Sequence, residues 1–256
     1  MVPKIIESGK KFGNMNTNPK FYPGDVSKEE ARRLFLENRM AFGREFGFDG
    51  HYMFMADQKK GDGSYFNVTS DYVLEHPNGW SDIEEDILHV SADCPGVVIG
   101  HAVADCPVII MSDYEKGITG IAHCSAALID KGLPLMLADS LLDAAYSSDD
   151  SLNVYVGACA SDKWIYDIYP PFAKDEKLWK DAIWVDDDGF YHIDMRKAIA
   201  QQLKERNIDF SKVRFNMDDT ISNPNYFSNS LGRLDEAKAG RHFTGAFYDK
   251  PKIKIK

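Results

Sequence analysis

The sequence has 256 residues, a length typical of one large domain, and its composition is ordinary for a globular protein, with 44% hydrophobic and 27% charged residues. The formal net charge of −10 opposes binding to nucleic-acid phosphates and to anionic membrane surfaces. Because there is no run of 18 apolar residues and no signal-peptide core at the start, we expect a cytoplasmic protein without a membrane span. The chain shows no linker and no internal repeat, which predicts a single domain over residues 1–256.

The first third of the chain begins with a turn-rich lead-in over 1–24. Ser27 and Glu30 then form a capping box that opens a helix, and Gly47 ends it. Periodicity and turn residues predict the next elements as strands over 51–56 and 64–69 and a polar loop over 75–86.

A group of short, β-branched segments follows Ile87. These segments, 96–103, 108–111 and 117–122, are typical of adjacent buried strands. The remaining elements are expected to be helices over 129–146, 172–182 and 195–206, strands over 154–156 and 212–217, and a loop-rich end over 223–249 with one short strand.

The candidate chemical centre lies among these buried segments. Cys106 follows one segment and precedes the next, and His123 ends the segment after that. If the segments pair in one sheet, the two side chains reach the same sheet edge, where rigid scaffolds often present catalytic groups. Asp105 could orient His123 or cap a turn.

A cysteine beside a histidine supports two chemistries. The imidazole can remove the thiol proton and make Cys106 a nucleophile, or both side chains can bind zinc. The structural alternative is that Cys106 packs as a small apolar residue. The other cysteines, Cys94, Cys124 and Cys159, form no CxxC pair with each other or with Cys106 and are interpreted as structural.

At these residues the chain resembles the laccase-domain (multicopper polyphenol oxidoreductase, YfiH-like) family. The family's "ADC-L-P" segment matches Ala104-Asp105-Cys106-Pro107, and its "AHAGWRG" matches the stretch from Ala122 to Leu128. Weaker matches, in the same order as in the family, are Asn38-Arg39, Val156-Gly157-Ala158, Tyr166-Asp167-Ile168, Tyr226-Phe227-Ser228 and Gly240-Arg241.

The resemblance implies an α+β sandwich of two mixed β-sheets with flanking helices, similar to the cytotoxic necrotizing factor-like cysteine hydrolase fold. It implies a purine nucleoside phosphorylase or adenosine deaminase-like enzyme, with purine nucleoside and phosphate as substrates. It further implies a zinc site, with copper as the alternative, whose ligands here would be Cys106 and His123. Nothing in the sequence indicates an oligomeric state.

The chain departs from the family pattern at the first metal ligand. The family's "QVHG" aligns with residues 58–61, so Lys60 stands where a ligand histidine is expected. A protonated lysine does not bind a metal ion. A replacement third ligand would have to come from another histidine, and the candidates are His51, His76, His89 and His101.

The arginines of the family's "GWRG" and terminal motifs are also replaced, by Ala127 and by Ser230 and Leu231. Arg233 and Arg241 could compensate, because arginine suits phosphate binding. The candidate substrate-binding residues are Asn38, Arg39, Gln58, Lys60, Arg233 and Arg241.

Two alternatives to a nucleoside phosphorylase stay open. One is a metal-free, deamidase-like cysteine hydrolase with Cys106 as nucleophile and His123 as base, in which a nearby Lys60 would favour the thiolate. The other is a catalytically inactive relative that keeps the fold as a binding module.

Overall fold

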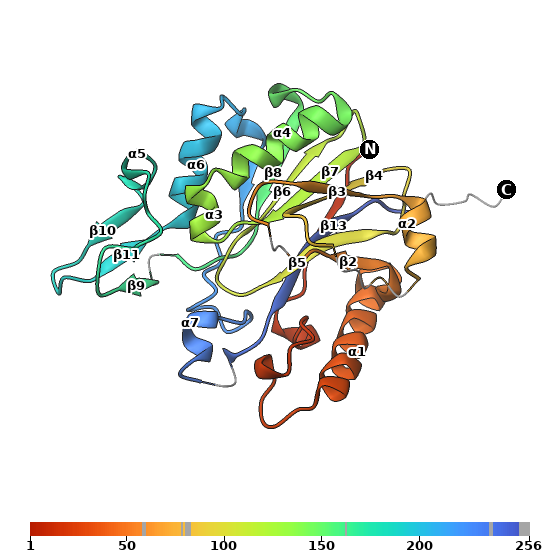
Figure 1. Ribbon diagram of the computed structural model, residues 1–256, viewed down its shortest axis with the longest axis horizontal. Helices are drawn as coiled ribbons and strands as arrows, with labels where there is room; N and C mark the ends of the chain where they lie inside the picture. Colours follow the sequence, from red (N-terminus) through yellow and green to blue (C-terminus); the bar gives the residue numbers. More distant parts are fainter. Residues whose placement is uncertain (58–59, 78, 80–82, 162, 236–237, 251–256) are drawn as a thin grey trace.

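The computed structural model describes residues 1–57, 60–77, 79, 83–161, 163–235 and 238–250. Three sheets are formed (Figure 1). The four-stranded sheet has the order β1 (Lys4–Glu7), β13 (His242–Phe247), β5 (Val98–Val103) and β2 (Met53–Met55). The six-stranded sheet has the order β12 (Val213–Phe215), β8 (Leu152–Val156), β6 (Val108–Asp113), β7 (Ile118–His123), β4 (Ile87–Ser91) and β3 (Tyr65–Val68).

Both large sheets are mixed, as expected. In the six-stranded sheet the outer pairs β12–β8 and β3–β4 are parallel and the inner pairs are antiparallel. In the four-stranded sheet only β2–β5 is parallel. A small third sheet of β10 (Ile183–Val185), β11 (Tyr191–Ile193) and β9 (Ile165–Tyr166) forms an arm at the left of Figure 1.

Helices α3 (Ala126–Asp130), α4 (Leu133–Ala145) and α6 (Met195–Glu205) cover the outer face of the six-stranded sheet, and α1 (Lys28–Phe46) covers that of the four-stranded sheet. The short helices are α2 (Ser70–Glu75), α5 (Glu176–Trp179) and α7 (Asn229–Gly232). Short 3₁₀ turns are η1 (Lys10–Phe12), η2 (Pro19–Phe21), η3 (Gly50–Tyr52), η4 (Asp149–Ser151) and η5 (Phe210–Lys212). No helix in the described ranges is long and apolar enough to cross a membrane.

Three apolar clusters hold the layers together. One lies between the six-stranded sheet and α3, α4 and α6, for example at Ile109 and Leu137. The second lies between the two sheets, where Ile110 and Ile99 belong to the same cluster, and the third packs Phe42 of α1 on the four-stranded sheet. Since β6 alternates its side chains between the first two clusters, it is buried on both faces, which explains its continuous apolar sequence.

The long helix α1 forms as predicted. The Ser27 side chain accepts a hydrogen bond from the Glu30 amide at 3.1 Å, and Gly47 ends the helix in the left-handed region with φ 83°. The helix 195–206 and the strands at 108–111, 117–122 and 154–156 are also confirmed to within one or two residues.

Several expectations about elements were wrong. The expected helix over 129–146 is two helices, because Gly132 adopts a left-handed conformation with φ 86° and Pro134 starts a new first turn. The segment 172–182 contains only the short α5, and 75–86 is preceded by the unforeseen α2.

The most consequential error concerns β5. This strand was expected beside β6, but the two lie in different sheets, and residues 104–107 cross from one sheet to the other. Its partner is β13, six residues long and fully buried, in the region where only a short strand was expected. Pairing between residues about 140 positions apart leaves no local pattern in the sequence.

Candidate functional site

The candidate site is built around the crossing segment 104–107. Asp105 has φ 74°, a left-handed conformation that aspartate tolerates better than most residues. Its carboxylate, 3% exposed, accepts hydrogen bonds from Thr220 Oγ1 at 2.8 Å, Ser228 Oγ at 3.2 Å and the Ser230 amide at 2.7 Å. Asp105 therefore ties the crossing segment to the C-terminal region, which supports the turn-capping interpretation rather than a contact that orients His123.

Cys106 and His123 lie at the same edge of the six-stranded sheet. His123 pairs with Val108 across β6 and β7, and the Cys124 amide donates to the Pro107 carbonyl at 2.9 Å. Both side chains are partly exposed, whereas the other three cysteines are buried. The pairing of β6 with β7, one of the two pairings considered from the sequence, places both residues at this edge.

The environment keeps both groups uncharged at neutral pH. Burial raises the pKa of the Cys106 thiol to about 12; Asp105 adds to this, and Arg241 opposes it. Burial, and then the charge of Arg241, lower the pKa of His123 to about 4. At neutral pH Cys106 is therefore an uncharged thiol and His123 an uncharged imidazole. The imidazole is able to accept a proton.

Arg241 supplies the positive charge at this site. Its Nη2 donates to Asn229 Oδ1 at 3.0 Å and its Nη1 to the Gly240 carbonyl at 2.7 Å. The guanidinium carbon lies 3.8 Å from the centroid of the Phe21 ring, a close cation–π arrangement. These contacts hold Arg241 rigidly where its charge reaches both Cys106 and His123.

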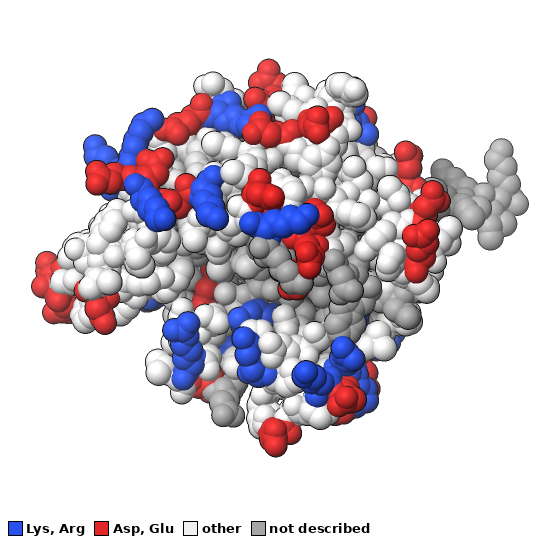
Figure 2. Space-filling model, in the orientation of Figure 1, with Lys and Arg blue, Asp and Glu red and all other residues white. Residues whose placement is uncertain are grey.

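A cleft of about 640 Å³ opens over Cys106, between the arm and α7. It is lined by Ala104, Asp105, Cys106, Lys163, Trp164, Ile165, Tyr166, Asp167, Ile221, Asn229, Ser230, Leu231, Arg233 and Leu234. Figure 2 shows the hollow below the arm, with Lys and Arg side chains on its α7 side. This volume is within the range of small-molecule sites.

Of the two predicted compensating arginines, Arg233 lines this cleft and Arg241 does not. Arg233 is exposed and also borders a smaller neighbouring pocket, which Arg241 lines together with Lys20 and Phe21. Among the described residues, the Arg233 guanidinium has no hydrogen-bond or ion-pair partner. Arg233 is thus the side chain that can turn toward an anion in the cleft.

Three other predicted substrate-binding residues do not line the cleft. Arg39 is 2% exposed and donates from Nε to the Gly50 carbonyl and from Nη2 to the carbonyls of His51 and Met53, so it fastens α1 to the chain that follows it. Asn38 donates to the Asn14 carbonyl at 2.9 Å. Lys60 pairs with Glu85 at 2.7 Å.

The expected help of Lys60 to a Cys106 thiolate therefore finds no support, because its ammonium is held by Glu85. Gln58 lies outside the described residues.

Of the four histidines considered as a third ligand, only His101 approaches His123, with ring centroids 6.0 Å apart. His51 contacts Asp49, His76 stacks on Tyr72, and His89 is hydrogen-bonded to Ser140 and Asn67. Within the described ranges, no three His, Cys, Asp or Glu side chains gather as a metal site. Because a zinc site uses at least three protein ligands, these residues do not fit the implied zinc or copper ion.

The sequence did not predict the residues that the arm contributes to the cleft. Trp164 and Tyr166 both line the cleft, with ring centroids 5.3 Å apart, and Lys163 lies beside them. Asn229, which holds Arg241, was missed as well. The cluster of aromatic residues at 164–172 was a possible signal, but the facing wall comes from α7, far along the chain.

Comparison with known proteins decides the family. The family model described as multi-copper polyphenol oxidoreductase laccase matches residues 12–248. The chain belongs to this family. No curated protein sequence matches it significantly.

Solved structures of family-like proteins share the fold. The hypothetical protein YfiH of Bacillus licheniformis is 17% identical with a TM-score of 0.73, covering 96% of this chain and 92% of that one. YlmD from Geobacillus stearothermophilus is 17% identical with a TM-score of 0.75, covering 97% and 92%. A Neisseria meningitidis protein is 16% identical with a TM-score of 0.66, covering 98% and 91%.

Proposed function

We propose that this member of the laccase-domain family is a purine nucleoside phosphorylase that binds its substrates in the cleft over Cys106. The observation that carries the proposal is the composition of that cleft, which is lined by the aromatic residues Trp164 and Tyr166 and by Arg233, whose guanidinium has no partner among the described residues. Such a lining suits a ligand with a flat base and an anion. Family membership supports the same activity.

The aromatic wall suits the purine. Trp164 and Tyr166 offer ring faces, and aromatic side chains bind flat heterocycles by offset or tilted stacking. Phe172 stacks against Trp164 with centroids 6.4 Å apart and supports the wall from behind. The base would enter between the arm and the Cys106 edge of the sheet.

The arginine side suits phosphate. Arg233 on the rim can form the paired hydrogen bonds that guanidinium groups make with phosphate oxygens, and the fixed charge of Arg241 adds to the attraction. Lys163 lines the same cleft. These cations face the carboxylates of Asp105 and Asp167, which also line the cleft.

The reaction proposed for this arrangement is a displacement at the sugar. An oxygen of dihydrogen phosphate bonds to C1′ while the C1′–N9 bond breaks, and the proton lost by phosphate balances the one that the departing purine takes up. Cys106 lines the cleft, and the neutral His123 lies at the same edge of the sheet, so these two groups could relay this proton. The proposed displacement uses no metal ion, because the described residues do not fit one.

The test is release of the free base from purified protein supplied with adenosine, inosine or guanosine and phosphate. We expect Arg233→Gln to raise the KM for phosphate at least about ten-fold, the loss of one charge-assisted contact, with a smaller change in the KM for nucleoside. Arg44→Gln, which removes an exposed arginine on α1, is the matched control and should change neither constant.

Two further measurements separate the alternatives. Ammonia release from adenosine would reveal deamination, and metal analysis of the purified protein would show whether an ion is retained. Absence of base release from every nucleoside, with or without added zinc, would overturn the proposal in favour of an inactive binding relative.

The cysteine hydrolase alternative makes a different demand on Cys106. It requires a thiolate near neutral pH, whereas burial holds the pKa of this thiol at about 12. We therefore expect alkylation of Cys106 by iodoacetamide to stay slow up to about pH 9 and to accelerate only above it. Fast alkylation at pH 7 would favour the hydrolase instead.

A further inference from the structure

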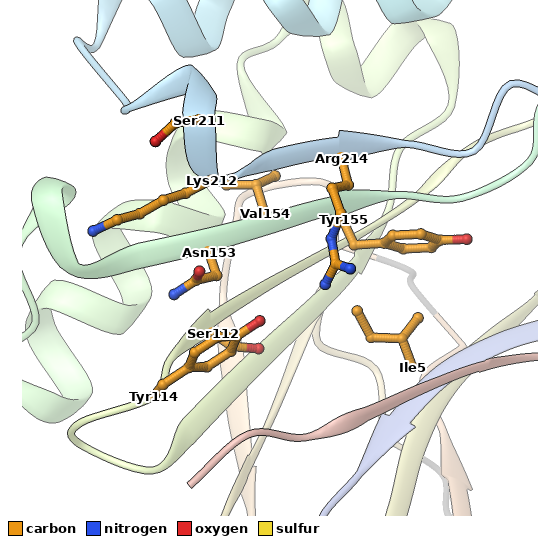
Figure 3. A pocket seen from close by; sticks show the side chains of 9 residues that line it. All are labelled: Ile5, Ser112, Tyr114, Asn153, Val154, Tyr155, Ser211, Lys212 and Arg214. Carbon is orange, nitrogen blue, oxygen red and sulfur yellow. The ribbon is translucent and has the colours of Figure 1, made fainter.

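A second pocket, of about 290 Å³, lies between the edge strands of the two large sheets (Figure 3). Its walls include Ile5, Ser112, Tyr114, Asn153, Lys212 and Arg214. The strand β6 separates it from the cleft described above, since Cys106 precedes the first residue of β6 and Tyr114 follows the last. The two cavities are therefore at opposite ends of one strand.

The pocket exists because the sandwich is open at this edge. Asn153 pairs with Ser112, and Tyr155 with Arg214, so these four side chains share the face of the sheet that looks toward β1. Strand β8 alternates accordingly: Leu152, Val154 and Val156 are buried, whereas Asn153 and Tyr155 are only partly so. Ile5 is the only residue of the other sheet in the lining, which leaves the polar face uncovered.

The charge of the lining is opposite to that of the protein. The chain carries a net charge of −10, yet the described residues that line the pocket include two cations and no carboxylate. Lys212 donates to the main-chain carbonyl of Asp150 at 2.5 Å, and its charge also interacts with the Asp209 carboxylate. The nearby carboxylate of Asp209 accepts from the Ser211 amide and is not part of the lining.

Arg214 and Tyr114 provide unused donors. Among the described residues neither the Arg214 guanidinium nor the Tyr114 hydroxyl has a hydrogen-bond partner. In Figure 3 the Arg214 guanidinium extends from β12 into the space next to Ile5. The Tyr114 hydroxyl and the Asn153 amide lie across the pocket from Ile5. Ser112 contributes less, because its hydroxyl is already bonded to Thr119 at 2.9 Å.

We propose that this pocket is a binding site for a small oxyanion, namely inorganic phosphate or the phosphate group of a small monoester. Arg214 would form the paired contacts, Lys212 would add charge, and Tyr114 and Asn153 would donate hydrogen bonds to the remaining oxygens. The volume admits phosphate or a sugar phosphate and is at the lower limit for a larger ligand. The site is independent of the activity proposed for the Cys106 cleft.

The experiment is calorimetric titration with inorganic phosphate and with ribose 5-phosphate, in a zwitterionic buffer with chloride at constant ionic strength. It is carried out on the wild type and on Arg233→Gln, which removes the phosphate-binding arginine of the other cleft. On the Arg233→Gln background, where the other proposed phosphate site is removed, we expect Arg214→Gln to weaken binding at least about ten-fold and Lys212→Gln to weaken it less. Arg44→Gln should leave it within about two-fold of its parent.

The two sources of the ligand are distinguished by their affinities. Tighter binding of ribose 5-phosphate than of phosphate assigns the site to a monoester, and equal binding assigns it to the free ion. Because Arg214 is exposed, its replacement should not affect folding, and thermal unfolding verifies this. The proposal would be overturned if the wild type did not bind, or if Arg214→Gln left binding unchanged on the Arg233→Gln background. Arg214 would then be a charged residue that keeps the edge strand β12 from pairing with strands of other chains.

Discussion

At the scale of single residues, Asp105 shows how one side chain can determine the geometry of a site without reaching a substrate. Its carboxylate accepts hydrogen bonds from Thr220, Ser228 and Ser230, and its charge is one cause of the raised pKa of Cys106. The adjacent Cys106 is therefore placed by a buried carboxylate that belongs to the crossing segment. Asp105 therefore has a structural role through its hydrogen bonds and an electrostatic role through its effect on the pKa of Cys106.

These two roles can be separated by substitution. Asp105→Asn keeps a residue that tolerates the left-handed conformation but loses the charge, and we expect it to destabilise the fold by about 1–3 kcal/mol because buried donors lose a charged acceptor. The pKa of the Cys106 thiol should fall at the same time, which urea unfolding and alkylation against pH measure together. Asp93→Asn, at an exposed turn, is the control; an unchanged thiol titration in Asp105→Asn would contradict the electrostatic role.

At the scale of elements, the pairing of β5 with β13 places the crossing segment. Gly100 and Gly245 face each other in this pair, and the Phe243 ring lies over both. A Cβ added at Gly100 would lie 2.2 Å from Cζ of Phe243 and 2.5 Å from the Thr244 carbonyl oxygen. The two glycines thus make room for a buried aromatic ring between the sheet and α1.

Gly100→Ala should therefore destabilise the protein by about 2 kcal/mol or more, because the Phe243 ring and the backbone must both move. Combining it with Phe243→Leu removes the ring that the new methyl meets, so the double variant should lose less stability than the sum of the single variants. Chemical denaturation of the four proteins measures this coupling. If the changes in the free energy of unfolding were strictly additive, contact with the Phe243 ring would not be the reason that Gly100→Ala is destabilising.

At the scale of the whole molecule, the buried histidines make the fold sensitive to acid. Burial lowers the pKa of His89 to about 4 and those of His101 and His242 to about 3, and each of these side chains is at most 3% exposed. In the unfolded chain these groups have pKa values of about 6.5. Between the folded and unfolded values the unfolded state binds more protons, so stability falls as the pH falls through this window.

We expect the free energy of unfolding to be nearly constant from pH 8 to pH 7 and to decrease from about pH 6.5 toward pH 4. Each of the three histidines contributes up to ~1.4 kcal/mol per pH unit there. His89→Gln should reduce the slope by one proton. Urea unfolding of the wild type and of this variant at half-unit intervals of pH tests this, and an unchanged slope in the variant would contradict it.

The sequence alone determined the local elements whose signals are contiguous: the capped helix α1, the apolar strands β6, β7 and β8, the family motifs around Cys106 and His123, and Arg233 and Arg241 as the cations near them. Tertiary structure decided that β5 crosses to another sheet, that Lys60 turns to Glu85, and that Trp164 and Tyr166 form the wall facing Arg233. The physical reason is range: capping and periodicity act over a few residues, whereas strand order, ion-pair partners and cleft walls depend on segments that only the folded chain brings together.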